Sequence, residues 1–417
     1  DLIKLFSEEI SYNCDITKEG TCMIKTSEGI ILSGDHFVRR LPDLLNCKPE
    51  DLLFVDIETT GLSPKNSDIY LIGCGYYDSG NWHICQFFAE SSDQEKETLE
   101  AFIDFSKDYK ILIHYNGDRF DIPFLLAKFE KHELFNPFAH MSSLDIYKEI
   151  KTYKKQLGLL DCKQKTIELY LGIQREDKYD GGKLIPVYQD YVVSKDAEKL
   201  KLLMLHNFED VKGMFDVLTM LRYKEFFNCL ANLPKDSIKT DVEIPSSEEL
   251  LELLPVRAKK VQANYYNDID GTQKKEVYMK LAVLKPLPSS LSGNLDGCYF
   301  KLDGDEAILR VPLYETTLKY FYSNYKDYYY LPKEDTALHK SIASFVDKDY
   351  RVKASPENCY TKKEGQYLQE WDLCFAPFFK TDYNDKRIFF DLNENMKKSR
   401  FAMSLYACHV IAHVLEI

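Results

Sequence analysis

The sequence has no apolar run long enough to cross a membrane, and its first residues lack the charged and apolar regions of a signal peptide. It also has no Cys-x-x-Cys pair, although it contains 11 cysteines. An odd number of scattered cysteines is not typical of a disulfide framework, and their spacing is not that of zinc or iron–sulfur ligands. We therefore expect a cytoplasmic protein with reduced thiols, without zinc and without an iron–sulfur cluster.

Positive charge is scarce as well. The chain has 54 Lys and Arg against 67 Asp and Glu, which gives a formal net charge of −13. Tight, sequence-independent binding to long duplexes depends on basic residues that displace counterions, so this balance argues against such binding. The 417 residues, of which 45% are hydrophobic, suffice for two or three domains with sizeable cores.

Two acidic residues interrupt the end of an apolar run at residues 52–62, Leu-Leu-Phe-Val-Asp-Ile-Glu-Thr-Thr-Gly-Leu. The run is typical of a buried strand, and Asp56 and Glu58 lie two residues apart, on the same strand face. Two buried carboxylates side by side repel each other unless a cation offsets the charge or one carboxyl group is protonated. The pattern predicts an oxygen-rich site suited to magnesium or manganese.

Two later segments add further candidates. Residues 111–125 are typical of a strand, an Asn-Gly turn and a helix that carries Asp121. Residues 202–211 have a helical apolar period, which places His206 and Asp210 on one helix face.

Other residues share these spacings or positions without the same context. His114 and Asp118 repeat the four-residue spacing, but they fall on a strand and a turn, where we do not expect them to face each other. Asp145, in Ser-Ser-Leu-Asp-Ile-Tyr, follows an apolar residue at an expected strand end. It either orders the site or caps the next helix.

The order and context of these motifs resemble those of the DEDD superfamily of metal-dependent 3′–5′ exonucleases, whose domain has the ribonuclease H-like fold. Two further stretches, Leu-Ile-Gly-Cys-Gly at 71–75 and Lys-Thr-Ile-Glu-Leu-Tyr-Leu-Gly at 165–172, are similar to YprB-type ribonuclease H-like proteins. The histidine subfamily places its base five residues before the last Asp, whereas His206 lies four before Asp210. That shorter spacing is the one of the tyrosine subfamily and of the YprB-type group.

The resemblance places Asp56, Glu58, Asp121 and Asp210 on the four acidic positions of the family. It implies two divalent ions, Mg²⁺ or Mn²⁺, with Asp56 bridging them. Glu58 and Asp210 would hold the ion that binds the attacking water, and Asp121 the other ion. His206 would take the proton from that water. The alternatives are acids that lie on the surface or cap helices, and a His206 that is merely packed.

The resemblance also implies contacts with the terminal nucleotide. The candidates surround the first two motifs: Thr59, Thr60, Gly61, Leu62, Asn116 and Phe120. Turn stabilisation and core packing are the alternative roles of Thr60 and Leu62, and Asn116 is alternatively a turn and helix-start residue.

Turns and composition divide the chain into three parts. Residues 1–50 are interpreted as an extension that packs on the next domain, 51–235 as a ribonuclease H-like exonuclease domain, and 248–417 as a C-terminal domain. We expect an α/β fold with a mixed sheet flanked by helices, followed by an α+β domain. The polar segment 177–186 either closes over a bound strand or is a plain surface loop.

The C-terminal part shows hairpin signals such as Asp303-Gly304 and Glu364-Gly365, and helical patterns near residues 335–346 and 395–415. Tyrosines mixed with Lys and Arg, notably between residues 350 and 367, favour single-strand binding. Strand packing is the alternative role of these tyrosines.

Together with the resemblance, the sequence predicts a nuclease that removes nucleotides from the free 3′ end of single-stranded DNA or RNA. The main alternative is a catalytically silent protein that binds nucleic acid or acts as a scaffold. The four acids favour the enzyme, because a binding protein has no need to keep them crowded. Cleavage of an RNA–DNA hybrid fits the segments around Asp121 and around His206 and Asp210 less well. No membrane partner is expected, and contact with a protein partner would fall to the C-terminal domain.

Overall fold

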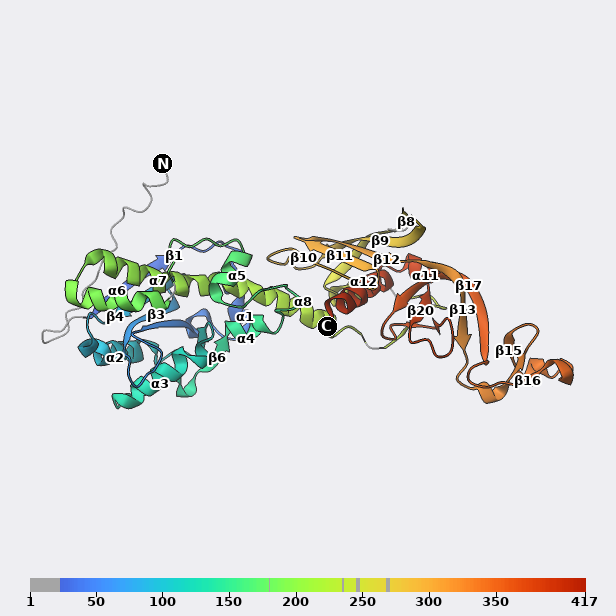
Figure 1. The fold of residues 1–417 in the computed structure, drawn as a ribbon, viewed down its shortest axis with the longest axis horizontal. Helices are drawn as coiled ribbons and strands as arrows, with labels where there is room; N and C mark the ends of the chain where they lie inside the picture. Colours follow the sequence, from blue (N-terminus) through green and yellow to red (C-terminus); the bar gives the residue numbers. More distant parts are fainter. Residues whose placement is uncertain (1–22, 180, 235, 245–247, 268–270) are drawn as a thin grey trace. The chain divides into compact units, whose positions relative to one another are not determined.

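The computed structural model describes residues 23–179, 181–234, 236–244, 248–267 and 271–417. The chain divides into two compact units, Asp1–Leu221 and Arg222–Ile417, coloured from blue to green and from green to red in Figure 1. The predicted domain limits at residues 50, 235 and 248 stay a prediction. Among the helices described, none combines the length and the apolar character needed to span a bilayer.

The first unit is built on a six-stranded sheet. Its strands are β1 (Ile24–Ile30), β2 (Leu52–Thr59), β3 (Ile69–Asp78), β4 (Asn81–Phe88), β5 (Ile111–His114) and β6 (Ser142–Asp145). Its helices are α1 (Leu41–Leu45), α2 (Glu95–Ser106), α3 (Asp121–Lys131), α4 (Ile146–Lys151), α5 (Gln164–Tyr170), α6 (Gly181–Ser194) and α7 (Ala197–Val217), and α8 (Leu221–Ala231) follows.

The strands lie in the order β1-β4-β3-β2-β5-β6. Pairing is antiparallel from β1 to β2 and parallel from β2 through β5 to β6. The sheet is therefore mixed, as the sequence predicts. Strand β1 lies within residues 1–50, the predicted extension, and pairs with β4 at the edge of the sheet. Residues 1–22 of the predicted extension lie outside the described part of the chain.

Helices cover both faces of this sheet (Figure 1). On one face, apolar side chains of β2 pack with α2 and α3 in a core that includes Leu53, Phe102 and Phe124. On the other face, α6 and α7 pack on β3 and β4 in a core that includes Tyr188 and Leu203. The alternation of side chains along a strand directs the even-numbered residues of β2 to the α7 face. Burial of both faces explains why β2 is an almost unbroken apolar run.

Two glycines of β3 let α7 approach the sheet closely. A Cβ at Gly73 would lie 2.2 Å from Oδ1 of Asn207, and a Cβ at Gly75 would lie 2.7 Å from the ring of Phe215. Phe215 of α7 also stacks on Phe54 of β2, with ring centroids 4.2 Å apart. These contacts fix α7 above the strand that carries Asp56 and Glu58.

The second unit is mostly antiparallel β-structure. Its sheets have the orders β10-β11-β12-β9-β8, β13-β17-β20-β19 and β15-β14-β16, and β18 pairs with β7. The strands are β7 (Ile238–Lys239), β8 (Val256–Asn267), β9 (Gln273–Val283), β10 (Leu291–Leu295), β11 (Cys298–Asp303), β12 (Glu306–Pro312), β13 (Tyr314–Phe321), β14 (Tyr328–Leu331), β15 (Thr336–His339), β16 (Val352–Lys353), β17 (Tyr360–Glu370), β18 (Phe375–Ala376), β19 (Phe378–Phe379) and β20 (Ile388–Asp391). The helices are α9 (Glu248–Glu252), α10 (Lys340–Ala343), α11 (Glu394–Lys398) and α12 (Arg400–Leu415).

The buried helix α12 packs on the five-stranded sheet. Ser404 of α12 accepts a hydrogen bond from the backbone N–H of Ala258 on β8, at 2.8 Å. The helix predicted near residues 395–415 is thus present, interrupted at Ser399, which caps the N-terminus of α12. The hairpin predicted at Asp303-Gly304 joins β11 to β12.

Two expectations for this unit are wrong. Glu364-Gly365 lies inside β17 rather than in a hairpin turn. The helix predicted at residues 335–346 is instead strand β15 followed by the four-residue α10. Leu338 pairs with Tyr329 of β14, and Phe345 is 91% exposed. The apolar spacing in this segment therefore reflects strand pairing and surface residues, not a buried helix face.

Candidate active site

Strand β2 presents two carboxylates to α7. Asp56 and Glu58 follow Phe54 on the face that α7 covers, so the alternation predicted from the sequence holds. Asp56 is half-buried and Glu58 is only 7% exposed. The strand ends in an irregular pairing with β3 between Glu58 and Thr59.

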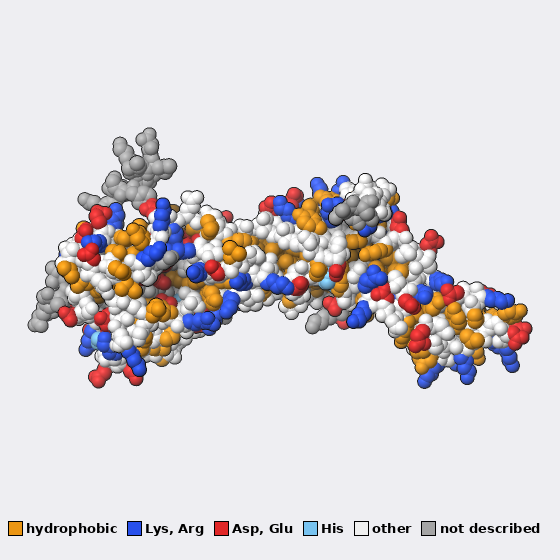
Figure 2. All heavy atoms as spheres, viewed as in Figure 1, with side chains coloured by type: hydrophobic (Ala, Val, Ile, Leu, Met, Phe, Trp, Pro, Cys, Tyr) orange, Lys and Arg blue, Asp and Glu red, His pale blue; other side chains and the backbone are white. Residues whose placement is uncertain are grey.

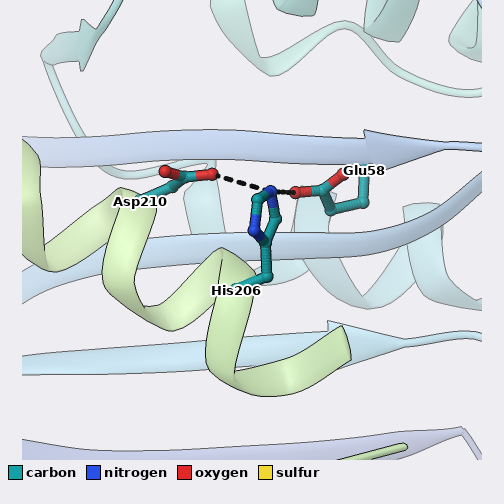
Figure 3. A group of neighbouring side chains, drawn as sticks. All are labelled: Glu58, His206 and Asp210. Atoms are coloured by element: carbon teal, nitrogen blue, oxygen red, sulfur yellow. Dashed lines mark ion pairs between the residues drawn. The ribbon is translucent and has the colours of Figure 1, made fainter. Parts of the chain in front are cut away.

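Helix α7 brings His206 and Asp210 to Glu58, as Figure 3 shows. Nε2 of His206 lies 3.3 Å from Oε1 of Glu58 and 3.2 Å from Oδ2 of Asp210. The imidazole is 2% exposed and stands between the two carboxylates, one helical turn from Asp210. The helix period in the sequence predicted that His206 and Asp210 share a face, and they do.

Asp121 joins the group from the other side of the sheet. It is the first residue of α3, and its Oδ1 accepts a hydrogen bond from the backbone N–H of Ile57 at 3.3 Å. Ile57 lies between Asp56 and Glu58, so this bond fixes the start of α3 to the strand that carries them. Asp121 is buried.

The four carboxylates influence one another's ionisation. Burial raises the pKa of Asp56 well above its usual range, and the charges of Asp210, Asp121 and Glu58 raise it further. Burial and the charges of Asp210 and Asp121 likewise raise the pKa of Glu58. Burial raises the pKa of Asp121 to about 7, although two backbone N–H groups oppose the rise.

This donor set fits a divalent cation. Crowded, buried carboxylates are unfavourable when ionised unless positive charge lies among them. Ligand atoms of Glu58, His206 and Asp210 lie within 4.8 Å of one another, which is close enough to share one ion. Carboxylate oxygens suit Mg²⁺ and Mn²⁺.

The tautomer of His206 is set by a residue that the sequence did not single out for this role. Nδ1 of His206 lies 2.6 Å from Oδ2 of Asp177, which is buried. Burial would raise the pKa of Asp177, but the N–H of Tyr179 and the imidazole outweigh it and lower the pKa. The ionised Asp177 accepts a proton-bearing Nδ1, so neutral His206 keeps the lone pair of Nε2 toward Glu58 and Asp210.

A buried cluster of polar side chains holds Asp210 in place. Arg175 donates to Asp210 and, through a second pair of bonds, to the carboxylate of Glu168. Gly213 leaves room for this cluster, because a Cβ there would lie 2.1 Å from Oε1 of Glu168. Gln164 also donates to the backbone carbonyl of Asp210 at 2.8 Å. Glu168 belongs to the stretch at 165–172 that carries the resemblance, which is the one sequence signal for this cluster.

Asp56 is held by a chain of amides. Nδ2 of Asn207 donates to Oδ2 of Asp56 at 2.9 Å, and Oδ1 of Asn207 accepts from Nε2 of Gln86, also at 2.9 Å. Asn207 is fully buried next to Gly73. The sequence gives no signal for this chain, because its members lie on three separate elements.

The predicted substrate-binding residues after β2 form a tight turn. Oγ1 of Thr59 donates to the carbonyl of Gly61 at 2.8 Å, and Oγ1 of Thr60 accepts from the N–H of Asp68 at 2.8 Å. Leu62 is 85% exposed, which removes core packing as its role. Turn stabilisation therefore accounts for Thr60, while a role in binding stays a prediction for all four residues.

Asn116 and Phe120 flank the start of α3. Asn116 has a left-handed backbone, with φ of 61°, and its N–H donates to Oδ1 of Asp145 at 2.8 Å. The same oxygen accepts from the N–H of Tyr147, so Asp145 both caps α4 and orders the Asn116 turn. Phe120 packs partly against the core of the α3 face. Contact with a nucleotide stays a prediction for Asn116 and Phe120.

The expectation that His114 and Asp118 do not face each other is wrong. Nε2 of His114 lies 3.4 Å from Oδ1 of Asp118, because the turn after β5 folds back over the strand. Nδ1 of His114 accepts from the N–H of Gly117 at 3.1 Å, so the neutral ring carries its proton on Nε2. That nitrogen faces Oγ of Ser143 at 2.8 Å. Both ring nitrogens of His114 thus have hydrogen-bond partners, although ligand atoms of His114, Asp118 and Asp145 also lie within 4.8 Å of one another.

Part of the predicted loop at residues 177–186 is helical, since α6 begins at Gly181. A Cβ at Gly181 would lie 3.6 Å from Oε2 of Glu58 and 3.9 Å from Nε2 of His206. Residue 180 lies outside the described part of the chain. The N-terminus of α6 thus borders the acidic cluster.

The match to a protein-family model agrees with this fold. Residues 53–222 match the family model RNase_H_2, described as RNase_H superfamily. No curated protein gave a significant sequence match. Similar solved structures include the family B DNA polymerase of the archaeon Pyrobaculum calidifontis, at 16% identity and a TM-score of 0.35, over 67% of this chain and 36% of the polymerase.

Two further solved structures are of exonuclease I. The E. coli enzyme in complex with a dT13 oligonucleotide is 13% identical, with a TM-score of 0.28 over 56% of this chain and 55% of that one. A product-bound exonuclease I is 11% identical, with a TM-score of 0.29 over 88% of this chain and 72% of that one. This chain spans about a third of the polymerase and about half of the E. coli enzyme. The mixed sheet, its two helical layers and the match over residues 53–222 together give this chain a ribonuclease H-like domain, followed by a β-rich C-terminal region.

Proposed function

We propose that this protein is a metal-dependent 3′–5′ exonuclease that hydrolyses phosphodiester bonds at the 3′ end of single-stranded DNA or RNA. The observation that carries the proposal is the grouping of Asp56, Glu58, Asp121 and Asp210 with a histidine whose Nδ1 is engaged by Asp177. A packed structural core would gain nothing from Asp56 and Glu58, whose pKa values are raised by burial and by the charges of neighbouring acids.

Two divalent cations, Mg²⁺ or Mn²⁺, would be held by the four carboxylates and would supply charge stabilisation and a more acidic water. The side chains have defined tasks around them. Nε2 of His206, whose lone pair faces the acids, would accept a proton from the attacking water. Asp177 would stabilise the imidazolium that forms, and Arg175 would hold the orientation of Asp210.

A catalytically silent nucleic-acid-binding or scaffold protein remains the competing proposal. The Asp177–His206 hydrogen bond favours the enzyme, because a scaffold does not need a histidine with a fixed tautomer among acids. Cleavage of an RNA–DNA hybrid is a third candidate, and only the shared fold and the acidic residues favour it.

Hydrolysis of end-labelled strands tests the proposal. With Mg²⁺ or Mn²⁺, 5′-labelled single strands of DNA or RNA should give ladders that shorten from the 3′ end, and a 3′-phosphate should block them. Asp56→Asn should abolish the activity, and Asp104→Asn, an 80% exposed site on α2, should not. Binding without hydrolysis would favour the silent protein. Internal cuts confined to a hybrid would favour the third candidate.

A further inference from the structure

A basic cavity lies in the second unit, at the N-terminus of α12. Its volume is about 540 Å³, and its lining comes from β8, α11 and α12. The lining has no Asp or Glu and has five cationic residues: Lys259, Lys260, Lys397, Lys398 and Arg400. In a chain with a net charge of −13, such a local excess of cations is unusual. Elsewhere, on the face seen in Figure 2, basic and acidic side chains are mixed.

An irregularity in β8 contributes two of these cations. The pairing of β8 with β9 shifts register between Ala258 and Lys260, as in a β-bulge. A regular strand would turn one of two consecutive residues toward the face that α12 covers. With the bulge, Lys259 and Lys260 are both exposed.

Acidic partners neutralise only part of this charge. Lys259 pairs with Glu306 at 3.2 Å, and Lys397 pairs with Glu394 at 3.3 Å. Over the described ranges of the chain, Lys260, Lys398 and Arg400 have no ion pair. Nε of Arg400 donates to the carbonyl of Ala258 at 3.0 Å, which fixes the guanidinium beside β8.

The helix adds to the positive potential of the cavity. Ser399 accepts a hydrogen bond from the N–H of Ala402, so the first turn of the 16-residue α12 is well formed. The N-terminus of a helix carries partial positive charge and favours anions. Here this effect supplements the unpaired lysines and arginine, which are the main source of charge.

Two other basic regions of this unit are less suited to anions. A cavity of about 600 Å³ is lined by Lys239, Lys362 and Lys363, but Asp241 also lines it. Asp335 pairs with Lys362, and Asp391 pairs with Lys363 at 2.7 Å.

The tyrosine-rich segment is the second of these regions. Between residues 350 and 367, Tyr360 packs on Phe321 and the fully buried Tyr367 packs on Phe379, each with ring centroids 5.2 Å apart. These rings already pack against other side chains, which favours the packing role of the tyrosines.

We infer that the cavity at the N-terminus of α12 binds phosphate groups, and that these are backbone phosphates of single-stranded nucleic acid. The inference rests on the proposed function for the class of ligand. Three unpaired cations in one concave site match a flexible polyanion that presents several phosphates, and free nucleotides or pyrophosphate share the same chemistry.

The test compares two double variants of the full chain. Lys260→Gln with Lys398→Gln changes two exposed cavity lysines that have no ion pair. Lys326→Gln with Lys386→Gln changes two exposed lysines outside this lining and removes the same charge. Affinity for a fluorescent 30-nucleotide strand is measured in EDTA against salt concentration.

The cavity variant should have a salt slope shallower by about 1.4, because each phosphate contact on a single strand contributes about 0.7. If the cavity variant and the wild type bind equally at 1 M salt, the variant should bind about 25-fold more weakly than the wild type at 0.1 M salt. The affinity of the control variant should change little. Hydrolysis of a dinucleotide should be unchanged in both variants. This measurement tests the proposed function independently of the cavity.

If both variants lose the same affinity for the strand, the cavity is not a phosphate site. Calorimetric titration with pyrophosphate distinguishes the source of the phosphate. If pyrophosphate binds the wild type but not the cavity variant, and oligonucleotide affinity is the same in both, the cavity serves a free phosphate compound and the nucleic-acid inference fails.

Discussion

At the scale of single residues, the acidic cluster is arranged at the expense of stability. Burial and the charges of neighbouring acids raise the pKa of Asp56 and Glu58, so the ionised forms of these two residues are disfavoured in the folded state. The folded protein then binds more protons than the unfolded chain, and stability falls as pH rises through and above the unfolded pKa of these acids. A bound divalent cation offsets this loss of stability, because it favours the ionised carboxylates of the folded protein.

Asp56→Asn should therefore raise stability when metal is absent. At pH 8 in EDTA we expect a Tm higher than that of the wild type by at least about 2 °C, because one buried charge is removed while the shape is kept. Adding Mg²⁺ or Mn²⁺ at 100 times Kd should stabilise the wild type by about 2.7 kcal/mol and so raise its Tm, and should leave the variant almost unchanged. Differential scanning fluorimetry measures both effects.

The control for this experiment is Asp104→Asn, which removes an exposed carboxylate from the same unit. It should keep the metal response of the wild type. A metal-induced shift that survives in Asp56→Asn would show that the ions bind elsewhere.

The second residue-scale prediction concerns Asp177. Asp177→Asn should lower turnover about 10- to 100-fold, because an amide can donate to Nδ1 of His206 and move the ring proton to Nε2. Nitrogen NMR shifts of the imidazole report the tautomer directly, and they should change with the substitution. Asp190→Asn, at a 60% exposed site on α6, should alter neither turnover nor the shifts. An unchanged tautomer would remove Asp177 from the mechanism.

Sequence patterns could predict the residues of this site that follow a period. Asp56 and Glu58 alternate along β2, and His206 and Asp210 recur along α7, so a strand or a helix suffices to bring each pair together. Asp177 could not be predicted in its role, because it lies 29 residues from His206 on a segment without periodicity. The pair His114 and Asp118 was missed for the opposite reason, since a turn and not an element brings them together.

At the scale of elements, α7 does most to assemble the site, and glycines control how closely it packs. Gly213 is the point at which the helix meets the buried pair of Glu168 and Arg175. Gly213→Ala would place a methyl group 2.1 Å from Oε1 of Glu168. We expect a loss of about 1 to 3 kcal/mol in the free energy of unfolding, measured by urea denaturation.

A second helical glycine provides the matched control. Gly182, at the start of α6, is exposed and has nothing within 4 Å of an added Cβ. Gly182→Ala should be neutral or should stabilise by up to about 1 kcal/mol, because alanine has the higher helix propensity. Equal stability of the two variants would mean that Glu168 and Arg175 shift to accommodate the methyl group.

Elements were predictable where both their period and their burial agreed. The strands β2 and β3 are mostly apolar, and α12 is buried along its length, so the sequences of these elements are compatible with few other structures. The helix predicted at residues 335–346 was wrong because an apolar spacing of three to four residues indicates a helix only if the apolar face is buried. Here Asp335 has a left-handed backbone, with φ of 49°, and is followed by strand β15 instead.

At the scale of the whole molecule, only the first compact unit contains the candidate metal site, whereas both units contain buried acids whose pKa is raised. The candidate metal site lies wholly in the first unit. The second unit contains Glu370, which is buried and has one oxygen, Oε1, with no hydrogen-bond partner in the described structure. Its other oxygen accepts from the N–H groups of Cys374 and Phe375, both at 3.0 Å. Burial raises the pKa of Glu370 to about 8.

The sign of the pH effect follows from this pKa. Between the unfolded value of 4.5 and about 8, folded Glu370 keeps a proton that the unfolded chain has lost, so stability falls as pH rises. Burial lowers the pKa of nearby His409 to about 4, which gives the opposite trend up to its unfolded value of 6.5. From pH 6.5 to 8 the effect of Glu370 is no longer offset by His409 and amounts to about 2 kcal/mol.

Thermal unfolding should therefore show two transitions that can be moved separately. Mg²⁺ should raise the transition of the first unit only. A rise from pH 6.5 to 8 should lower that of the second by about 4 to 8 °C, and Glu370→Gln, which stays neutral, should largely abolish this drop. Asp56→Asn should cancel the metal response without moving the second transition. Calorimetry of the full chain checks this, and a single transition that both Mg²⁺ and Glu370→Gln move would mean that the units unfold together.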